Sequence, residues 1–306
     1  MKRISPAHLS RSTSPARDDS DLFSNPPPSP FGRRPTGVST AMRHTLSIAR
    51  KELNVYFTTP LPYALFAVST VFTGFFLIGV IQNFQRLSLA AMQFPQYLDS
   101  SFLNLTDLVV LPCIHQTGLL VAITAPFLSM RLIAEEKRQR TFELLMTAPI
   151  RPLDLVLGKY VSGVLILTMT LGCTFLAPLM LDKFAISVDG SSGIEWSTVR
   201  VAFLGLFLWA CAAMAIGLFV SALTDSQAVA AIISLLALIL LWSVGWMGQS
   251  AEAGVIQTVL SYMSAPNHLM GFVQGVIHLQ DLTYFLSFVV LGLFLSHRAI
   301  EAQRWT

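Results

Sequence analysis

The sequence contains little charge, and this argues against a water-soluble globular fold. Only 12% of its residues are Asp, Glu, Lys or Arg, whereas 53% are hydrophobic and the mean hydropathy is +0.62. Soluble domains carry roughly 25% charged residues. Apolar runs recur along the chain, each near the roughly 20 residues that a helix needs to cross a bilayer. The composition therefore predicts an all-α, polytopic membrane protein.

Several kinds of catalytic chemistry are also missing. The sequence has no Walker-type glycine-rich loop that ends in Lys-Ser or Lys-Thr, so the chain is not expected to bind ATP itself. Its six histidines show no paired metal-ligand spacing such as H-E-x-x-H. No nucleophile stands in a pattern that suggests an enzyme. We predict no catalytic residue, no metal and no cofactor in this chain.

Charges at mid-membrane depth are absent too. Asp107, Arg131 and Arg200 lie only at the edges of the apolar runs. Proton- and ion-coupled transporters bury such charges within their spans, so this pattern counts against a secondary transporter. His115 lies inside a run, where we expect it to make interhelical hydrogen bonds. The three cysteines also fall within runs, where they predict apolar packing rather than disulfides.

Six membrane spans are predicted from the apolar runs. Pro112 and Pro126 interrupt the second span, which neighbouring helices can accommodate. The last span is the shortest. The expected ranges are 61–81, about 108–132, 161–181, about 201–223, 228–247 and about 282–296.

Lysine and arginine concentrate on one side of these spans, and short cytoplasmic segments accumulate such residues. Only Arg86, Lys183 and Arg200 fall on the other side. Both termini are therefore predicted to be cytoplasmic. This topology also accounts for the net charge of +3, so no nucleic acid partner is expected. The residues on the expected cytoplasmic side are Lys2, Arg3, Arg11, Arg17, Arg33, Arg34, Arg43, Arg50, Lys51, Arg131, Lys137, Arg138, Arg140, Arg151, Lys159, Arg298 and Arg304.

The chain before the first span divides into two parts. Residues 1–41 are rich in Ser, Pro and Arg and predict a disordered extension. A membrane domain is expected over residues 42–306. Met42 opens the periodic sequence, which raises the hypothesis that translation begins there. From Arg43 to Thr59, apolar residues repeat at helical spacing opposite basic ones, which predicts an interfacial helix. Pro60 and Pro62 then turn the chain into the first span. An ordinary basic anchor is the alternative.

The connection between spans two and three, Arg131 to Lys159, holds an unusual apolar cluster. Its charged first half predicts a continuation of the second span, with pairs of Glu135 with Arg138 and Glu136 with Arg140. An apolar cluster of Phe142, Leu144, Leu145 and Met146 follows. A short helix there is suited to docking in a partner's groove, although packing on the protein's own surface is the alternative.

The connection between spans five and six, residues 248–281, is long and contains two weakly amphipathic pieces. These are Val255 to Met263 and His268 to Leu279, with Pro266 between them. They predict short helices that dip into the membrane, while a plain external loop remains the alternative.

Several short motifs in a fixed order resemble the ABC-2-type permeases, most closely the branch of the gliding-motility permease GldF and of NosY from nitrous oxide reductase maturation. The resemblance covers about Arg43 to Trp305, and Arg140 departs from the glycine that is usual in the family. The matching motifs are Ala49-Arg50-Lys51-Glu52-Leu53 with Tyr56-Phe57 and Pro60; Glu135-Glu136-Lys137 with Thr141-x-Glu143-Leu144-Leu145 and Thr147-Ala148-Pro149; Gly158-Lys159; Gly217 with Ser221-x-Leu223-Thr224 and Gln227; and Arg304-Trp305.

The resemblance implies the permease subunit of an ATP-driven transporter, an exporter or a gliding-associated complex, in the bacterial inner (plasma) membrane. Two permease subunits, as a homodimer or heterodimer, would pair with two P-loop ATPase subunits that carry ATP and Mg²⁺. It also implies an interfacial (elbow) helix with Arg50, Lys51, Glu52, Tyr56 and Phe57. The implied coupling residues, which transmit ATPase closure to the spans, are Glu135, Glu136, Lys137, Arg138, Thr141, Phe142, Glu143, Leu144 and Leu145.

The sequence is also compatible with two other functions. One is a membrane anchor or scaffold of a larger envelope complex that transports nothing. The other is a secondary transporter, which the missing intramembrane charges disfavour.

Overall fold

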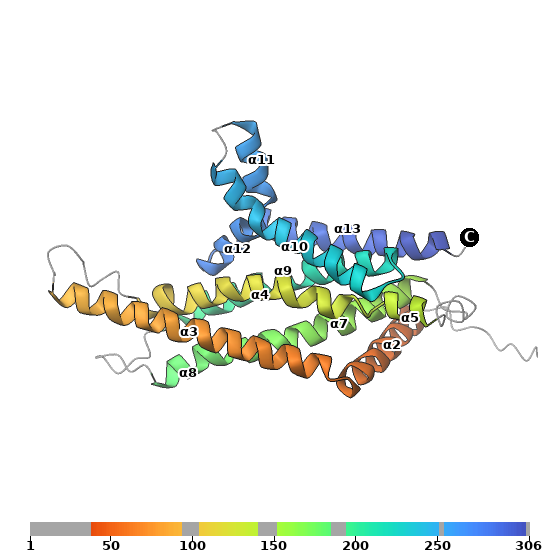
Figure 1. Ribbon diagram of the computed structural model, residues 1–306, viewed down its shortest axis with the longest axis horizontal. Coiled ribbons are helices and arrows are strands. Elements are labelled where there is room, and N and C mark those ends of the chain that lie inside the picture. The colour runs from red at the N-terminus through yellow and green to blue at the C-terminus, as the bar shows by residue number, and fades with distance from the viewer. Residues whose placement is uncertain (1–37, 94–103, 140–151, 185–193, 251–253, 304–306) are drawn as a thin grey trace, which may run out of the picture. The chain divides into compact units, whose positions relative to one another are not determined.

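The computed structural model describes residues 38–93, 104–139, 152–184, 194–250 and 254–303, and these are helical apart from short turns. The chain divides into two compact units, Met1–Thr40 and Ala41–Thr306. The second unit forms a bundle of long helices (Figure 1). Strands are absent from the described ranges.

Within the described residues, six helical segments are long and apolar enough to cross a membrane, which confirms the predicted fold class. α2 (Val38–Thr58) precedes the first of them. The six segments are α3 (Leu61–Gln93), η2 with α4 and α5 (Thr106–Arg138), α7 with α8 (Pro152–Phe184), α9 (Trp196–Leu223), α10 (Gln227–Ser250) and α13 (Leu279–Gln303).

All six spans in the described residues are longer than hydropathy predicted, as α3 and α13 illustrate. α3 continues to Gln93 rather than ending at Ile81, and α13 covers Leu279–Gln303 rather than 282–296. The additional residues include Asn83, Arg86, His297 and Glu301. Helical backbone hydrogen bonds do not require apolar side chains, so polar residues extend both helices beyond the apolar run.

The second span does not continue straight into the charged segment, contrary to prediction. The π-helical turn η2 (Thr106–Val110) leads into α4 (Leu111–Ser129), and α5 (Ala134–Arg138) begins after a turn. Pro112 lies where the π-helical turn η2 passes into α4, and such a turn changes the hydrogen-bond pattern of the helix just before the proline. The charged segment is therefore a separate five-residue helix.

α9 is the central helix of the bundle. It packs most extensively against α13 and α4, and it also contacts α7, α10 and α12 (Ala265–Val273). Small residues allow this close packing, as is common between membrane helices. A Cβ added at Gly292 of α13 would lie 2.9 Å from Ala215 of α9, and Trp209 Nε1 donates to the Gly118 carbonyl over 2.9 Å.

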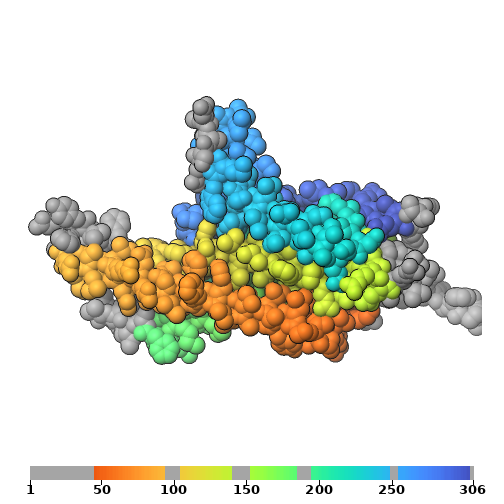
Figure 2. Space-filling view, in the orientation of Figure 1, coloured from red at the N-terminus to blue at the C-terminus, as the bar shows by residue number. Residues whose placement is uncertain are grey.

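α3 and α10 carry apolar side chains that are exposed on the outside of the bundle. Both helices lie at the surface seen in Figure 2. Phe75 is 76% exposed and Leu236 63% exposed. Such faces require lipid or another apolar partner, as expected for a chain in a bilayer.

Two short helices lie between the last two spans, as predicted. α11 (Val255–Met263) has the expected bounds, but the second piece is α12 (Ala265–Val273) rather than 268–279. Pro266 does not divide the pieces, because it occupies the first turn of α12, where its missing N–H costs nothing. The chain then turns at Gly275, whose φ of +80° favours glycine.

Candidate functional site

A buried lysine joins three helices at one end of the bundle. Lys159, in the third turn of α7, is only 1% exposed. Its Nζ lies 3.0 Å from Glu52 Oε1 on α2 and 2.8 Å from Glu136 Oε1 on α5. A charge removed from water is tolerated only when it is paired and hydrogen-bonded. Lys159 therefore ties α2, α5 and α7 together.

A serine from α9 caps the short helix α5. Ser221 Oγ accepts the backbone N–H groups of Ile133 and Ala134, at 3.2 and 3.1 Å, and lies 3.3 Å from the Met130 carbonyl, to which it donates. An isolated helix of five residues is unstable in water, because the free energy needed to nucleate it exceeds the stabilisation from its few hydrogen bonds. α5 therefore depends on α9 for its position.

Lys137 attaches the other end of α5 to the turn between α9 and α10. Its Nζ donates to the Ala222 carbonyl over 2.5 Å and lies 3.6 Å from Asp225 Oδ1. A cation near the C-terminus of a helix is stabilised by the unpaired carbonyl groups there. The carbonyl of Ala222 also accepts from Gln303 Nε2 of α13 at 3.4 Å, so three spans meet beside α5.

α2 makes two further contacts with the end of the second span. Tyr56 is buried and donates its hydroxyl to the Leu128 carbonyl over 2.7 Å. Burial, and secondarily the charge of Glu52, raises the pKa of Tyr56, so the phenol remains a donor. Arg131 donates to Thr59 Oγ1 over 3.2 Å and pairs with Glu135 over 2.9 Å.

We refer to this group as the α5 cluster. It combines contacts from α2, α4, α5, α7 and α9 that lie far apart in the sequence. Its members are Glu52, Tyr56, Arg131, Glu135, Glu136, Lys137, Lys159 and Ser221.

Two glycines let helices approach closely enough to form the cluster. A Cβ at Gly158 would lie 2.8 Å from Ile48 Cγ2 of α2, and one at Gly217 would lie 2.6 Å from Ser129 Cβ of α4. Both distances are too short for non-bonded carbon atoms. The motifs Gly158-Lys159 and Gly217 with Ser221 thus each combine a close approach with a polar contact.

The predicted interfacial residues divide between two environments. Arg50 and Lys51 are exposed, and Phe57 is 38% exposed. Glu52 and Tyr56 instead face the α5 cluster. The helix is therefore fixed to the bundle through polar groups as well as through its apolar face.

The predicted coupling residues fall partly on α5. Glu135, Glu136 and Lys137 contact other parts of this chain, and Arg138 is exposed. Glu135 was predicted to pair with Arg138, but the structure pairs it with Arg131, one turn earlier. Arg140 and the coupling residues Thr141, Phe142, Glu143, Leu144 and Leu145 lie outside the described residues.

Sequence reasoning missed two essential members of the cluster. Lys159 and Ser221 appeared only as parts of motifs, and neither was assigned a partner. The available signal was a preceding glycine, one residue before Lys159 and four residues before Ser221. Across the described ranges, no group of three His, Cys, Asp or Glu residues is placed to hold a metal ion.

Comparison with known proteins identifies the family. Residues 46–297 match the model of the ABC-2 family transporter protein. This range includes α3 through most of α13 and the whole α5 cluster. A search of curated proteins found no match. Members of this family are the membrane components of ABC transporters. The match spans most of the sequence, so this chain belongs to the ABC-2 transporter family.

Proposed function

We propose that this chain is the permease subunit of an ATP-driven exporter or gliding-associated complex, within the branch of GldF and NosY, and that a separate P-loop ATPase supplies ATP and Mg²⁺. The family membership supports a membrane subunit of such a transporter. The observation that carries the coupling role is the double pairing of Lys159 with Glu52 and Glu136.

The α5 cluster can transmit movement from one side of the membrane to the spans. α5 is bonded to α7 through Glu136, to α9 through Ser221, and to the α9–α10 turn through Lys137. Any displacement of α5 must therefore move these helices or break buried polar contacts. Packed interfaces with such contacts shift between discrete arrangements rather than deform continuously.

The ATPase would bind the segment that joins α5 to α7. The described ends of this segment are Arg138, which follows Lys137 of the cluster in α5, and Pro152, the first residue of the helix that carries Lys159. In this proposal Phe142, Leu144 and Leu145 fill a groove of the ATPase, and Thr141 and Glu143 contact its rim, as in interfaces with an apolar anchor. The charges of Glu135, Glu136 and Lys137 then fix the helix that the segment pulls on.

A second permease subunit would cover part of the exposed apolar surface. The outer faces of α3 and α10 supply such surface, and lipid covers the remainder. We place the α5 cluster, with both termini, on the cytoplasmic side of the bacterial inner membrane. The concentration of Lys and Arg there supports this orientation.

Co-purification tests the proposal. The native protein is solubilised and captured, and the bound proteins are identified by mass spectrometry and assayed for ATP hydrolysis. We expect a P-loop ATPase in equal amounts. Phe142→Asp should abolish its recovery, because a buried carboxylate cannot replace an apolar anchor. Phe184→Asp, at a side chain that is 78% exposed on α8, is the matched control.

A membrane protein recovered without an ATPase would refute the proposal and favour the anchor. Unchanged recovery with Phe142→Asp would refute the docking segment alone. Correct membrane insertion of both variants is checked by protease protection.

A further inference from the structure

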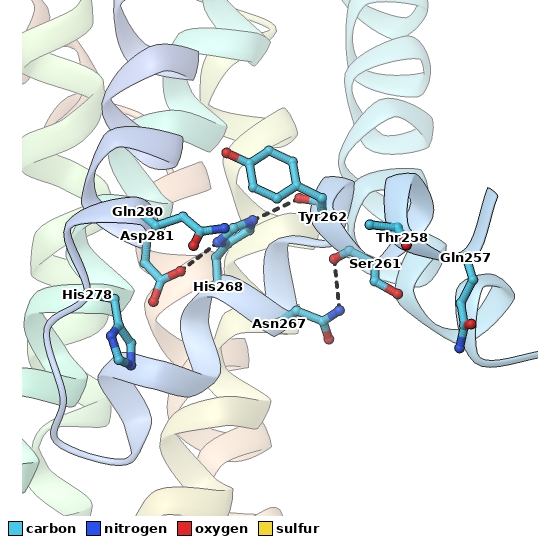
Figure 3. A pocket seen from close by; sticks show the side chains of 9 residues that line it. All are labelled: Gln257, Thr258, Ser261, Tyr262, Asn267, His268, His278, Gln280 and Asp281. Atoms are coloured by element: carbon cyan, nitrogen blue, oxygen red, sulfur yellow. Dashed lines mark hydrogen bonds and ion pairs between the residues drawn. The ribbon is translucent and has the colours of Figure 1, made fainter. Parts of the chain in front are cut away.

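A polar pocket lies at the junction of α11, α12 and the start of α13. Its volume is about 600 Å³ (Figure 3). Each of the nine residues that line it carries a side-chain hydrogen-bonding group. This is unexpected in a chain of which 53% is hydrophobic, and none of these residues belongs to the α5 cluster.

The floor of the pocket is a buried His268 whose two ring nitrogens both have partners. Nδ1 lies 2.6 Å from Asp281 Oδ1 of α13, and Nε2 lies 2.8 Å from the Tyr262 carbonyl. The Tyr284 ring stacks on the imidazole, with centroids 3.9 Å apart, and its hydroxyl donates to the Met263 carbonyl over 2.7 Å. The floor is therefore a fixed connection between α11, α12 and α13.

The carboxyl group of Asp281 is already engaged within the floor of the pocket. Its Oδ1 lies 2.6 Å from His268 Nδ1, which is hydrogen-bonding distance. A carbonyl oxygen can only accept a hydrogen bond, so Nε2 donates to Tyr262. A ligand that bound this carboxyl would therefore compete with His268.

The lining excludes several classes of ligand. Among the described residues, neither lysine nor arginine lines the pocket, so it lacks the groups that usually bind phosphate or carboxylate. The only carboxyl group in this described lining is that of Asp281, and a cation would have to compete for it with His268. Each of the same nine residues carries a polar group, so an acyl chain or the apolar side chain of a peptide would bury these groups without partners.

The remaining groups match a ligand with many hydroxyls. Gln257 on α11 and Gln280 on α13 stand on opposite sides of the pocket, and each amide can both donate and accept. Ser261 adds a hydroxyl between them. Tyr262 is 51% exposed and offers a ring face against which C–H groups can pack.

We propose that this pocket binds a neutral polyhydroxylated group, namely a sugar ring from a free saccharide or from a glycolipid headgroup. The amides of Gln257 and Gln280 bind hydroxyls, Tyr262 packs against the ring, and the His268–Asp281 pair holds the three helices in place. The proposal does not depend on ATP coupling, because the pocket is built from α11, α12, α13 and the turn that joins the last two.

Binding is measured on the full chain in nanodiscs of phosphatidylglycerol, without any ATPase. Maltoside detergents are avoided throughout, since their headgroup is itself a probe. Maltose is titrated calorimetrically as the free saccharide. In parallel, a photoreactive glucosyl-diacylglycerol is incorporated in the nanodiscs, and the crosslinked peptides are identified.

The double variant Gln257→Leu with Gln280→Leu removes two hydrogen bonds and should weaken binding about 10- to 30-fold, at roughly 1 kcal/mol for each bond. Gln274→Leu is the matched control, because Gln274 is exposed at the end of α12 and outside the pocket. Crosslinks should fall on peptides of α11 and α13.

Saturable binding of maltose that the double variant weakens supports a saccharide site. Crosslinking of the glycolipid alone, weakened in the same way, supports a headgroup site. Absence of saturable binding for both probes overturns the proposal. Equal binding by the wild type and the double variant, or equal crosslinking of a photoreactive phosphatidylglycerol, overturns it as well.

Discussion

Replacing Lys159 by methionine would remove the cation that pairs with the carboxylates of both Glu52 and Glu136. The two side chains are only 15% and 19% exposed, so water compensates poorly. At an effective dielectric constant of about 20, each contact near 3 Å corresponds to roughly 5 kcal/mol of Coulomb attraction, most of which offsets desolvation. Removing one partner of such a buried pair typically costs about 3–5 kcal/mol. We expect Lys159→Met to lower the free energy of unfolding by about that amount.

A double-mutant cycle separates the ionic contact from other effects of the substitution. Lys159→Met, Glu136→Gln and the double variant are unfolded by increasing SDS in mixed micelles, and helix content is followed by circular dichroism. Because Lys159 Nζ and Glu136 Oε1 are in direct contact at 2.8 Å, we expect a coupling energy of about 1–3 kcal/mol. The double variant should be more stable than the sum of the single effects predicts.

An exposed ion pair provides the control for this cycle. Arg298 and Glu301 are 62% and 40% exposed, and such pairs contribute about 0–1 kcal/mol. Arg298→Met should therefore change stability little. If the effects of Lys159→Met and Glu136→Gln add to within about 0.5 kcal/mol, the reasoning about the α5 cluster is wrong.

Three further substitutions test the contacts around α5. Ser221→Ala removes the cap of α5 and should cost about 0.5–2 kcal/mol, with faster amide exchange of Ala134 measured by mass spectrometry. Tyr56→Phe removes one buried hydrogen bond and should lower the SDS midpoint by the equivalent of about 1 kcal/mol without changing helix content. Gly217→Ala places a Cβ against α4 and should cost about 1–3 kcal/mol. Gly172→Ala is the control, because an added Cβ there meets nothing within 4 Å. It should leave the SDS midpoint unchanged or raise it. Equal effects of Gly217→Ala and Gly172→Ala would contradict the packing argument.

Hydropathy predicted the number of spans because it depends on side chains that are local in sequence. It could not give the ends of α3 and α13, where polar residues continue the helix beyond the apolar run. It also merged α4 with α5, since the break near Ile133 is stabilised by Ser221, which no local pattern connects to it. Long-range hydrogen bonds therefore set the boundaries that sequence reasoning missed.

The charged residues of the candidate site were recognised, but their partners were not. The pairing of Glu135 was predicted from spacing within one helix, the only geometry that a single sequence supplies. The structure instead uses Arg131 across the turn before α5, and it joins Glu136 to a lysine on another helix. Tyr56 likewise was named only as a residue of the interfacial helix, and its hydrogen bond to the carbonyl of Leu128 was not predicted.

The order of the Lys159 contacts along the chain has a consequence for biogenesis. Glu52 and Glu136 both precede Lys159 in the sequence, so both carboxylates have been synthesised when the lysine leaves the ribosome. The third span can then insert with the lysine near its start already paired, and this pairing does not wait for a later segment. Truncated chains that end just after this span already contain all three ionic groups and can form the connection before the last three spans exist.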